Sequence, residues 1–326
     1  MGLEARGIEL FHSIQDELEQ AEELMYRALD VSGERCREMA TYLLRAGGKR
    51  LRPALVLLCA RFGPRRPSWA VPLGAVVELL HVATLVHDDI LDGARVRRGR
   101  PTVHAMWDLR SSVLTGDLLF AAAFGLLTER CGEAAFGPLS RVVMGMCQAE
   151  VEQAARTFDL NRNEAEYLEH ISRKTARFMS ECCRLGAVAG GAPPAVAERL
   201  GAYGFALGVG FQIVDDILDL SGDPDRMGKA VGTDMREGIF TLPVIHALSC
   251  SPEGEALRRL LERRELGAQG LEAVLDVLRR SGSLRYGWKV AESYMGRARR
   301  ELSALPAIPS RATLSAITDF VLARTA

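Results

Sequence analysis

Six aspartates fall into two identical segments, Asp-Asp-Ile-Leu-Asp, at residues 88–92 and 215–219. Each segment ends a long apolar stretch with helical spacing, so that residues four apart lie on one face of a helix. Carboxylates crowded on one face repel one another, and the negative end of the helix dipole adds to the cost. Mg²⁺ removes both costs, since it prefers carboxylate oxygens together with substrate phosphates. Two copies therefore predict a site for Mg²⁺ and a polyphosphate, whereas one copy alone would more often be a solvated helix end. The aspartates are Asp88, Asp89, Asp92, Asp215, Asp216 and Asp219.

Basic residues that could bind phosphates lie near the first cluster in the sequence. Residues 97–100 (RRGR) follow it closely, and residues 47–53 (GGKRLRP) precede it. Arginine binds phosphate through its planar fork and lysine as a point charge. Taken alone, each basic segment would more often be solvated surface. The candidates are Lys49, Arg52, Arg97, Arg98, Lys174 within a helical stretch, and Lys229 within a glycine-rich segment.

The histidines and cysteines give only a weak metal signal. His81, His87 and His104 do not have the spacing of a zinc site. His81 lies seven residues before Asp88 and therefore on the same helix face, where contact with a phosphate suits it better. The seven cysteines are an odd number without a CxxC motif. They predict reduced thiols in a cytoplasmic protein, rather than a disulfide framework.

Helical periodicity runs through nearly the whole chain, and no segment alternates with period two. The length of 326 residues suggests about two domains, but no linker-like segment divides the chain. We therefore predict one all-α domain over residues 1–326, a single large helical bundle. The stretches 70–92 and 112–131 are apolar on most faces and are expected to be central helices. A third long helix is expected over 163–190.

The charge balance excludes several classes of protein. Lysine and arginine number 41 and aspartate and glutamate 42, a net charge of −1. A nucleic-acid-binding protein would usually carry a basic excess. The longest apolar run, residues 118–127, is far shorter than the ~20 residues that span a bilayer. The N-terminal segment lacks the features of a signal peptide. We expect no nucleic-acid partner and no transmembrane segment.

Five spaced motifs resemble the trans-isoprenyl diphosphate synthases, also called polyprenyl synthetases. They are GGKRLRP (47–53), LLHVATLVHDDILDGARVRRGRPTVH (79–104), KTA (174–176), GFQIVDDILD (210–219) and GKAVGTDMREGIFTLPVIHAL (228–248). The resemblance covers essentially the whole chain. It implies an all-α fold of the isoprenoid synthase type around a central cavity, usually as a homodimer. It also implies a transferase that condenses isopentenyl diphosphate with an allylic diphosphate, with farnesyl or geranylgeranyl diphosphate as the expected starter.

The resemblance also assigns roles to individual residues. Two or three Mg²⁺ ions would bridge the allylic diphosphate to Asp88, Asp92 and Asp216, supported by Asp89, Asp215 and Asp219. The same substrate would contact Arg97, Lys174, Thr175, Gln212 and Lys229. Isopentenyl diphosphate would be bound by Lys49, Arg52, His81 and Arg98. No protein base is evident, so the departing diphosphate is the expected proton acceptor. One position departs from the pattern: Ile239 stands where many members carry lysine.

Product length is predicted from the helix that precedes Asp88. In the family, an aromatic residue four or five positions before the first aspartate stops chain growth early. Those positions hold Thr84 and Ala83 here, with Leu80 deeper, and Phe120 and Phe124 could form a floor. Small residues favour a product of six or more isoprene units over farnesyl or geranylgeranyl diphosphate.

Other classes stay open at this point. The chain could be a subunit of a heteromeric synthase, either non-catalytic or catalytic with a different partner. Non-catalytic subunits usually lack the aspartate motifs, which are intact here. A head-to-head or cyclising terpenoid synthase of similar fold is disfavoured by the two basic motifs, which suit a second diphosphate substrate. A purely structural helical bundle is the last alternative.

Overall fold

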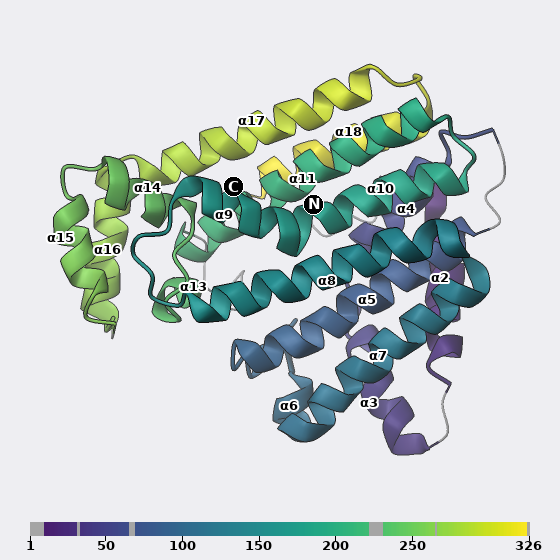
Figure 1. Cartoon of the computed structure of the whole chain (residues 1–326), viewed down its shortest axis with the longest axis horizontal. Coiled ribbons are helices and arrows are strands. Elements are labelled where there is room, and N and C mark those ends of the chain that lie inside the picture. The colour runs from purple at the N-terminus through teal and green to yellow at the C-terminus, as the bar shows by residue number, and fades with distance from the viewer. Residues whose placement is uncertain (1–9, 31–32, 65–68, 222–230, 265, 325–326) are drawn as a thin grey trace. The chain divides into compact units, whose positions relative to one another are not determined.

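The computed structural model describes residues 10–30, 33–64, 69–221, 231–264 and 266–324. Helices make up most of this part of the chain (Figure 1), which confirms the predicted all-α fold. The long helices are α2 (Gln15–Ala28), α3 (Glu34–Arg45), α4 (Leu51–Ala60), α5 (Ala70–Leu91), α7 (Leu109–Arg130), α8 (Glu133–Ala155), α9 (Glu164–Ile171), α10 (Arg177–Ala189), α11 (Pro194–Ser221), α14 (Leu242–Cys250), α15 (Gly254–Leu261), α16 (Ala268–Arg280), α17 (Ser283–Ser303) and α18 (Pro309–Ala323). Short helical segments are η1 (His12–Ile14), α6 (Val103–Met106) and α13 (Thr233–Arg236), and η2 (Ser172–Ala176) is a π-helix.

The described residues also contain one short antiparallel hairpin, β1 (Val96–Arg97) with β2 (Arg100–Pro101). The search for period-two alternation missed this hairpin, because two residues per strand are too few to show alternation. Its two central residues, Arg98 and Gly99, have φ of 52° and 72°. Positive φ at both positions is typical of the type I′ turn that joins two-residue hairpins, and glycine adopts it without strain.

The chain divides into two compact units, and each is described by itself. The first comprises Met1–Val143, Met179–Ala202 and Leu302–Ile317, and the second Met144–Phe178, Tyr203–Glu301 and Thr318–Ala326. The prediction of one domain over residues 1–326 stays a prediction.

In the first unit, α5 and α7 pack along their length, with α2 and α4 against α5 (Figure 1). His87 of α5 fits against Gly116 of α7, and Trp69 just before α5 lies near Cys131 just after α7. The two helices are therefore antiparallel. The predicted start of α7 at residue 112 is three residues late, because the Asp108 side chain caps the helix by accepting from the Ser111 N–H at 2.8 Å.

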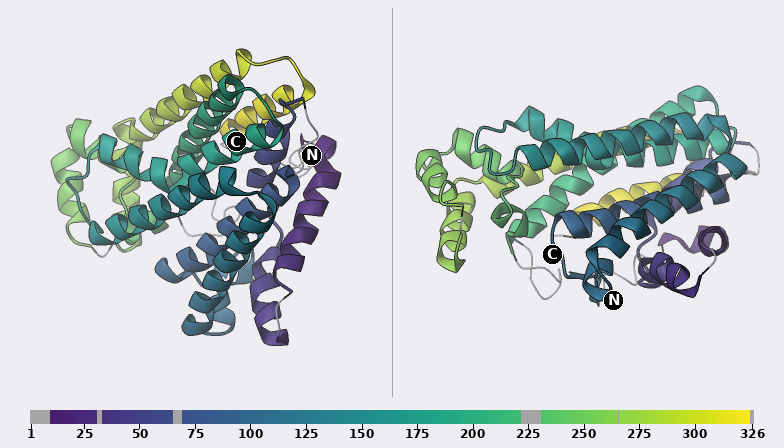
Figure 2. Two further views of the ribbon diagram at one scale, coloured as in Figure 1. Left: turned by 45° about the vertical axis from the view of Figure 1, so that its right-hand side comes forward. Right: turned by 60° about the horizontal axis from the view of Figure 1, so that its bottom comes forward.

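In the second unit, α14, α15 and α16 surround a small apolar core, and α15 and α16 lie side by side in Figure 1 and in both views of Figure 2. The third predicted long helix is interrupted: α9 passes into the π-helix η2 and then into α10. Such a π-bulge leaves no trace in apolar spacing, and π-bulges are frequent at functional sites. A Cβ at Gly208 of α11 would lie 2.6 Å from the Ala176 Cα, so glycine allows α11 to approach the π-helix closely.

In the part of the chain that the structure describes, two helices, α5 and α7, are long and apolar enough to cross a membrane by length and composition alone. Inside the protein, 67% of the apolar window of α5 and 39% of that of α7 are buried. A core helix passes the same test, so these helices are weak evidence for a span. The expected absence of a transmembrane segment stays a prediction.

Candidate active site

The first aspartate cluster lies at the carboxyl end of α5. Asp88 and Asp89 occupy the last turn, and Asp92 caps the helix. Asp89 is 1% exposed and accepts from the Arg97 Nε at 2.5 Å through its Oδ1. Burial raises the pKa of Asp89, while Arg97 acts to lower it. Its Oδ2 is buried and has no hydrogen-bond partner among the described residues. This atom is a carboxylate oxygen that still has room for a ligand.

The hairpin β1–β2 fixes the positions of two arginines, Arg97 and Arg98, through its tight turn. Arg97, on β1, reaches Asp89, while Arg98, in the turn, donates to the Gly47 carbonyl. Gly47 belongs to the basic segment that precedes α4, so the two basic motifs of the sequence meet in the first unit. A Cβ at Gly48 would lie 2.6 Å from the Arg98 guanidinium, which leaves no room for a side chain there.

Positive charge concentrates around His81 on α5. Burial lowers the pKa of His81 well below its usual value, and the nearby guanidinium groups lower it further, so its imidazole is neutral at pH 7. Burial also lowers the pKa of Arg52 and of Arg98. Such a cluster of guanidinium groups favours an anion. The arginines concerned are Arg50, Arg52, Arg97 and Arg98. Lys49, the other predicted member, is exposed.

Arg50 has a structural role that the sequence did not reveal. It precedes α4 with a left-handed φ of 46°, a conformation that costs free energy for a residue other than glycine. Its guanidinium binds the buried Glu78 at 2.9 Å and Glu22 at 2.8 Å. These ion pairs hold the start of α4, which carries Arg52.

The second aspartate cluster, near the end of α11, has a different set of partners. Asp216 is 6% exposed and accepts from the Tyr167 hydroxyl at 2.6 Å and from the Gln212 Nε2 at 2.9 Å. Gln212 in turn accepts from the Thr175 hydroxyl at 2.8 Å. Burial and the negative charges of Asp234 and Asp215 raise the pKa of Asp216 to about 8. Neutral donors thus orient the carboxyl group.

Three further predicted residues belong to the second unit: Lys174, Asp215 and Asp219. Arg324 donates to Asp215 at 3.0 Å, and its guanidinium lies 5.1 Å from the centre of the Phe211 ring. Lys174, in the π-helix, forms an ion pair with Glu150 at 2.6 Å. Asp219 is buried at the last turn of α11.

The predicted site residues thus fall into two groups, one in each unit. The first unit brings together Arg52, His81, Asp88, Asp89, Asp92, Arg97 and Arg98, and the second Lys174, Thr175, Gln212, Asp215, Asp216 and Asp219. Lys229 lies outside the described residues. Of the predicted chain-length residues, Leu80 and Ala83 are fully buried, and Thr84 is half-buried and donates to the His81 carbonyl.

Comparison with known proteins bears on this pair of sites. Residues 33–278 match the model of the polyprenyl synthetase family. The chain belongs to the polyprenyl synthetase family. It is 35% identical over 312 residues to heptaprenyl diphosphate synthase component 2 of Geobacillus stearothermophilus, covering 96% of this chain and 97% of that one. Curated family members of similar identity are named as synthases of shorter as well as longer prenyl chains.

Two solved structures of the family are also similar. A decaprenyl diphosphate synthase from Rhodobacter capsulatus is 36% identical with a TM-score of 0.92, covering 98% of this chain and 99% of that one. A polyprenyl synthase from Caulobacter crescentus, complexed with calcium and isoprenyl diphosphate, is 35% identical with a TM-score of 0.91, covering 98% of each chain. The predicted family, and with it a prenyl-transferring enzyme that acts on isoprenyl diphosphates, is confirmed.

The carboxylates of this synthetase fit a divalent cation by their chemistry. Among the residues that the structure describes, no three side chains of histidine, cysteine, aspartate or glutamate gather closely enough to hold one already. The Asp89 Oδ2 is buried without a partner in the described part of the chain, and Asp216 carries a raised pKa beside two further aspartates. A bound cation would satisfy the first and relieve the repulsion at the second. Carboxylate oxygens are the ligands that Mg²⁺ prefers.

Several site residues were missed from the sequence. Tyr167 lies seven residues before Lys174, a spacing of two helical turns that could have placed it on the same face. Asp234 belongs to a motif that was recognised, but its effect on Asp216 depends on the fold. Glu150 and Arg324 gave no signal, since each meets its partner across a long separation in the chain.

Proposed function

We propose that this chain extends an allylic diphosphate by head-to-tail condensation with isopentenyl diphosphate in a Mg²⁺-dependent reaction. The product is an all-trans polyprenyl diphosphate of six or more isoprene units. The observation that carries the proposal is the pair of identical aspartate clusters, each with its own fixed set of donors. Arg97 holds the first cluster, and Tyr167 and Gln212 hold the second.

The allylic diphosphate is assigned to the two aspartate clusters. Asp88, Asp89 and Asp92 of the first unit and Asp215, Asp216 and Asp219 of the second would hold Mg²⁺, which would neutralise charge on the departing diphosphate. Two or three ions suit this number of carboxylates. The Lys174 ammonium and the Arg97 guanidinium bind the same diphosphate, and Lys229 is assigned to it by sequence alone. Gln212 orients Asp216 through its Nε2, and its amide oxygen, which accepts from the Thr175 hydroxyl, would stabilise the developing cation.

Isopentenyl diphosphate is assigned to the arginine cluster of the first unit. Arg52 and Arg98 bind its diphosphate, the exposed Lys49 adds a point charge, and the neutral His81 donates a hydrogen bond.

The allylic C1–O bond breaks to give a carbocation and diphosphate. The double bond of isopentenyl diphosphate attacks the cation, and the resulting cation loses a proton to form the new double bond. The released diphosphate accepts that proton, so atoms and charges balance.

A product of six or more units follows from the small side chains before Asp88. Ala83 and Leu80 are fully buried and Thr84 is half-buried, and none of them is aromatic. Farnesyl diphosphate, labelled isopentenyl diphosphate and Mg²⁺ are incubated with the purified protein, and the products are sized. A product that stops at farnesyl or geranylgeranyl diphosphate would contradict the proposed length and favour a short-chain synthase.

The variant Ala83→Phe tests whether the side chain at position 83 sets the length of the product. A phenyl ring at this position blocks the growing chain, so the main product should become shorter by several isoprene units. Ala83→Val is the matched control, because it adds little length, and its product should stay close to the original. An unchanged product distribution in Ala83→Phe would show that this position does not line the path of the chain.

The assembly we propose is a homodimer in the cytoplasm. Several apolar side chains of the first unit are exposed along α7 and at the start of α8: Leu109, Val113, Leu114 and Phe136. Exposed apolar side chains can mark an interaction site, and they support the proposed dimer. None of the seven cysteines, all within the described residues, forms a disulfide.

A heteromeric enzyme is the second candidate, because two curated relatives are named as components of a synthase. Size-exclusion chromatography with light scattering on the purified chain distinguishes the two. A dimer that turns over alone supports the homodimer. A chain that gives no turnover until another protein is added supports the heteromeric enzyme.

A further inference from the structure

Arg324, directly after α18, connects that helix to the second aspartate cluster. Its Nη2 donates to the Asp215 Oδ1 at 3.0 Å, and its guanidinium carbon lies 5.1 Å from the centre of the Phe211 ring. Phe211 and Asp215 are four residues apart on α11 and therefore lie on one face of the helix. The arginine thus contacts an aromatic ring and a carboxylate one turn apart, all within the second unit.

The ion pair between Arg324 and Asp215 uses only half of the guanidinium fork. The Nη1 atom is buried and has no hydrogen-bond partner among the described residues. The Asp215 side chain is 47% exposed, so water and salt screen the pair, and a bidentate pair would hold the carboxylate more firmly. The Phe211 ring, in contrast, attracts the guanidinium whether or not Asp215 is bound. Arg324 can therefore release Asp215 and keep its place beside α11.

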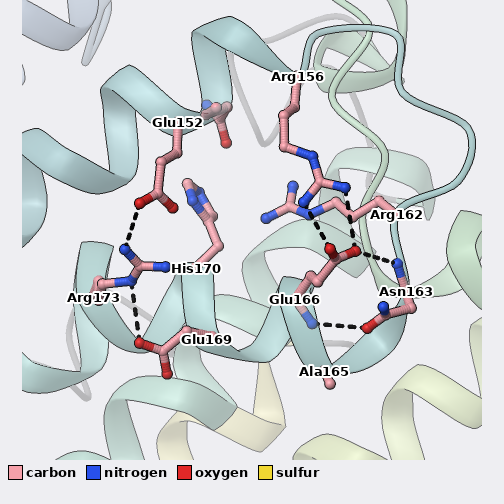
Figure 3. Close-up of a pocket in the computed structure, with 10 residues that line it drawn as sticks. Glu152, Arg156, Arg162, Asn163, Ala165, Glu166, Glu169, His170 and Arg173 are labelled. Atoms are coloured by element: carbon pink, nitrogen blue, oxygen red, sulfur yellow. Dashed lines mark hydrogen bonds and ion pairs between the residues drawn. The ribbon is translucent and has the colours of Figure 1, made fainter.

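Asp215 is paired with Arg324 although it is one of the carboxylates assigned to Mg²⁺. The guanidinium of Arg162 serves other carboxylates. It lines a pocket of about 440 Å³ beside α9 together with Glu166 (Figure 3), and it interacts electrostatically with Glu166 and Asp216. A metal ion and the Arg324 guanidinium would therefore compete for the same carboxylate.

We propose that Arg324 is a positioning residue that stands in for a divalent cation at Asp215. Its guanidinium holds the carboxylate before the metal binds and gives way to the metal afterwards. This inference rests on the proposed function, which assigns Asp215 to Mg²⁺. The positive charge beside the cluster opposes binding of a free cation, whereas a diphosphate brings negative charge that offsets it. The second cluster should therefore bind the metal weakly alone and tightly together with diphosphate.

Mn²⁺ binding by the full-length protein, measured by electron paramagnetic resonance, tests this inference without turnover. The ions bound by the second cluster are identified by their loss in Asp216→Asn. In the absence of diphosphate, Arg324→Gln should bind these ions about tenfold more tightly, because a ligand is released and a positive charge is removed. With inorganic diphosphate present, at matched concentrations of free Mn²⁺, the variant and the original protein should bind them about equally.

Two further variants separate the charge of Arg324 from a structural role. Arg324→Lys keeps the charge and should bind Mn²⁺ as the original protein does. Arg299→Gln is the matched control, because Arg299 pairs with Asp319 of α18 at 2.6 Å in the same unit. Asp319 is not assigned to the metal, so Mn²⁺ binding should be unchanged in this control. An ion pair that only stabilised the fold would not tighten metal binding when it is broken.

Unchanged or weaker Mn²⁺ binding in Arg324→Gln would overturn the inference. Equal tightening in Arg324→Lys would overturn it as well, since the charge remains in that variant. Synthase activity of the original protein is assayed separately. If the chain extends no prenyl diphosphate but Arg324→Gln still binds Mn²⁺ more tightly, the result contradicts the proposed function and supports the role of Arg324.

Discussion

The two aspartate clusters have the same five residues but opposite surroundings. In the first, the buried Asp89 is neutralised by a guanidinium, since Arg97 lies 2.5 Å from it. In the second, the buried Asp216 is held by an uncharged hydroxyl and an uncharged amide, beside two further aspartates. Identical sequence therefore places one buried carboxylate against a charged donor and the other against neutral donors, while Arg324 pairs with the neighbouring Asp215.

The difference suggests a division of labour between the clusters. A carboxylate with a fixed counter-charge is stable without a cation, because the ion pair offsets much of the cost of burial. A carboxylate with a pKa of about 8 gains far more when a cation arrives, since the cation removes both the repulsion and the proton. Binding of Mg²⁺ should therefore change the second cluster more than the first.

The largest expected effect comes from Asp216→Asn. Losing one charged ligand at the reacting diphosphate should lower kcat about 10²–10³-fold, the usual range for a group that stabilises developing charge. The free energy of unfolding measured in a chelator should not fall, because the substitution removes a carboxyl group that is destabilised by burial. Steady-state kinetics and urea unfolding measure the two quantities.

Asp89→Asn is the matched comparison for this variant. It removes the partner of Arg97, so it should lower both activity and the free energy of unfolding in a chelator. If the two variants lose stability equally, the contrast between the clusters is wrong.

The sequence predicted the helices, because they depend on local spacing, whereas the assignment of the site residues stays a prediction. Apolar periodicity located α5 and α11, and the aspartates at their ends follow from position alone. It could not reveal how each carboxylate is balanced, since Arg97 reaches Asp89 through a tight hairpin and Tyr167 reaches Asp216 across 49 residues. Nor could it reveal the π-helix that carries Lys174, because one extra residue per turn leaves no mark in the pattern.

The next largest expected effect is the pH dependence of stability that His170 causes. His170 in the second unit can be compared with His81 in the first. The His170 ring is buried and the His81 ring is half-buried, and both lie among cations and are neutral at pH 7. The pKa of His170 is about 3 in the folded protein and about 6.5 when unfolded. Below pH 6.5 the unfolded chain binds the extra proton, so stability falls as the pH falls. The loss attributable to His170 between pH 6.5 and 4 is about 3 kcal/mol.

His170→Gln should remove this part of the pH dependence. The difference in the free energy of unfolding between the variant and the original protein, followed by urea titration at each pH, isolates it from the carboxylates that also titrate in this range. A constant difference between pH 6.5 and 4 would show that His170 is already protonated in the folded protein.

Arg97→Gln breaks the charge balance of the first cluster directly. Asp89 would be left buried without its counter-charge, which should cost about 2 kcal/mol of stability, less than for a fully buried pair because Arg97 is partly exposed. Added Mg²⁺ should restore part of the loss, since a cation replaces the guanidinium. Thermal unfolding with and without Mg²⁺ measures both effects. Arg100→Gln, on the facing strand of the hairpin, is the control and should change neither.

Tyr167→Phe is the smallest of these changes and tests the second cluster most closely. The phenol is fully buried and orients one oxygen of Asp216. Removing it should leave the fold intact but weaken cation binding about tenfold, the low end of the range for groups that orient metal ligands. Mn²⁺ binding by electron paramagnetic resonance reports this without any need for turnover, and the Mg²⁺ concentration for half-maximal activity should rise in parallel. The KM for isopentenyl diphosphate should stay constant.

Tyr286→Phe is a close control for this effect, because its hydroxyl also donates to a carboxylate, Glu164 at 2.7 Å, in the same unit. Glu164 is not assigned to the metal, so Mn²⁺ binding should be unchanged in this variant. If both variants weaken Mn²⁺ binding equally, Tyr167 acts through the stability of α9 and not through Asp216. If only Tyr167→Phe does so, the neutral donors of the second cluster prepare it for the cation, as Arg97 does by charge in the first.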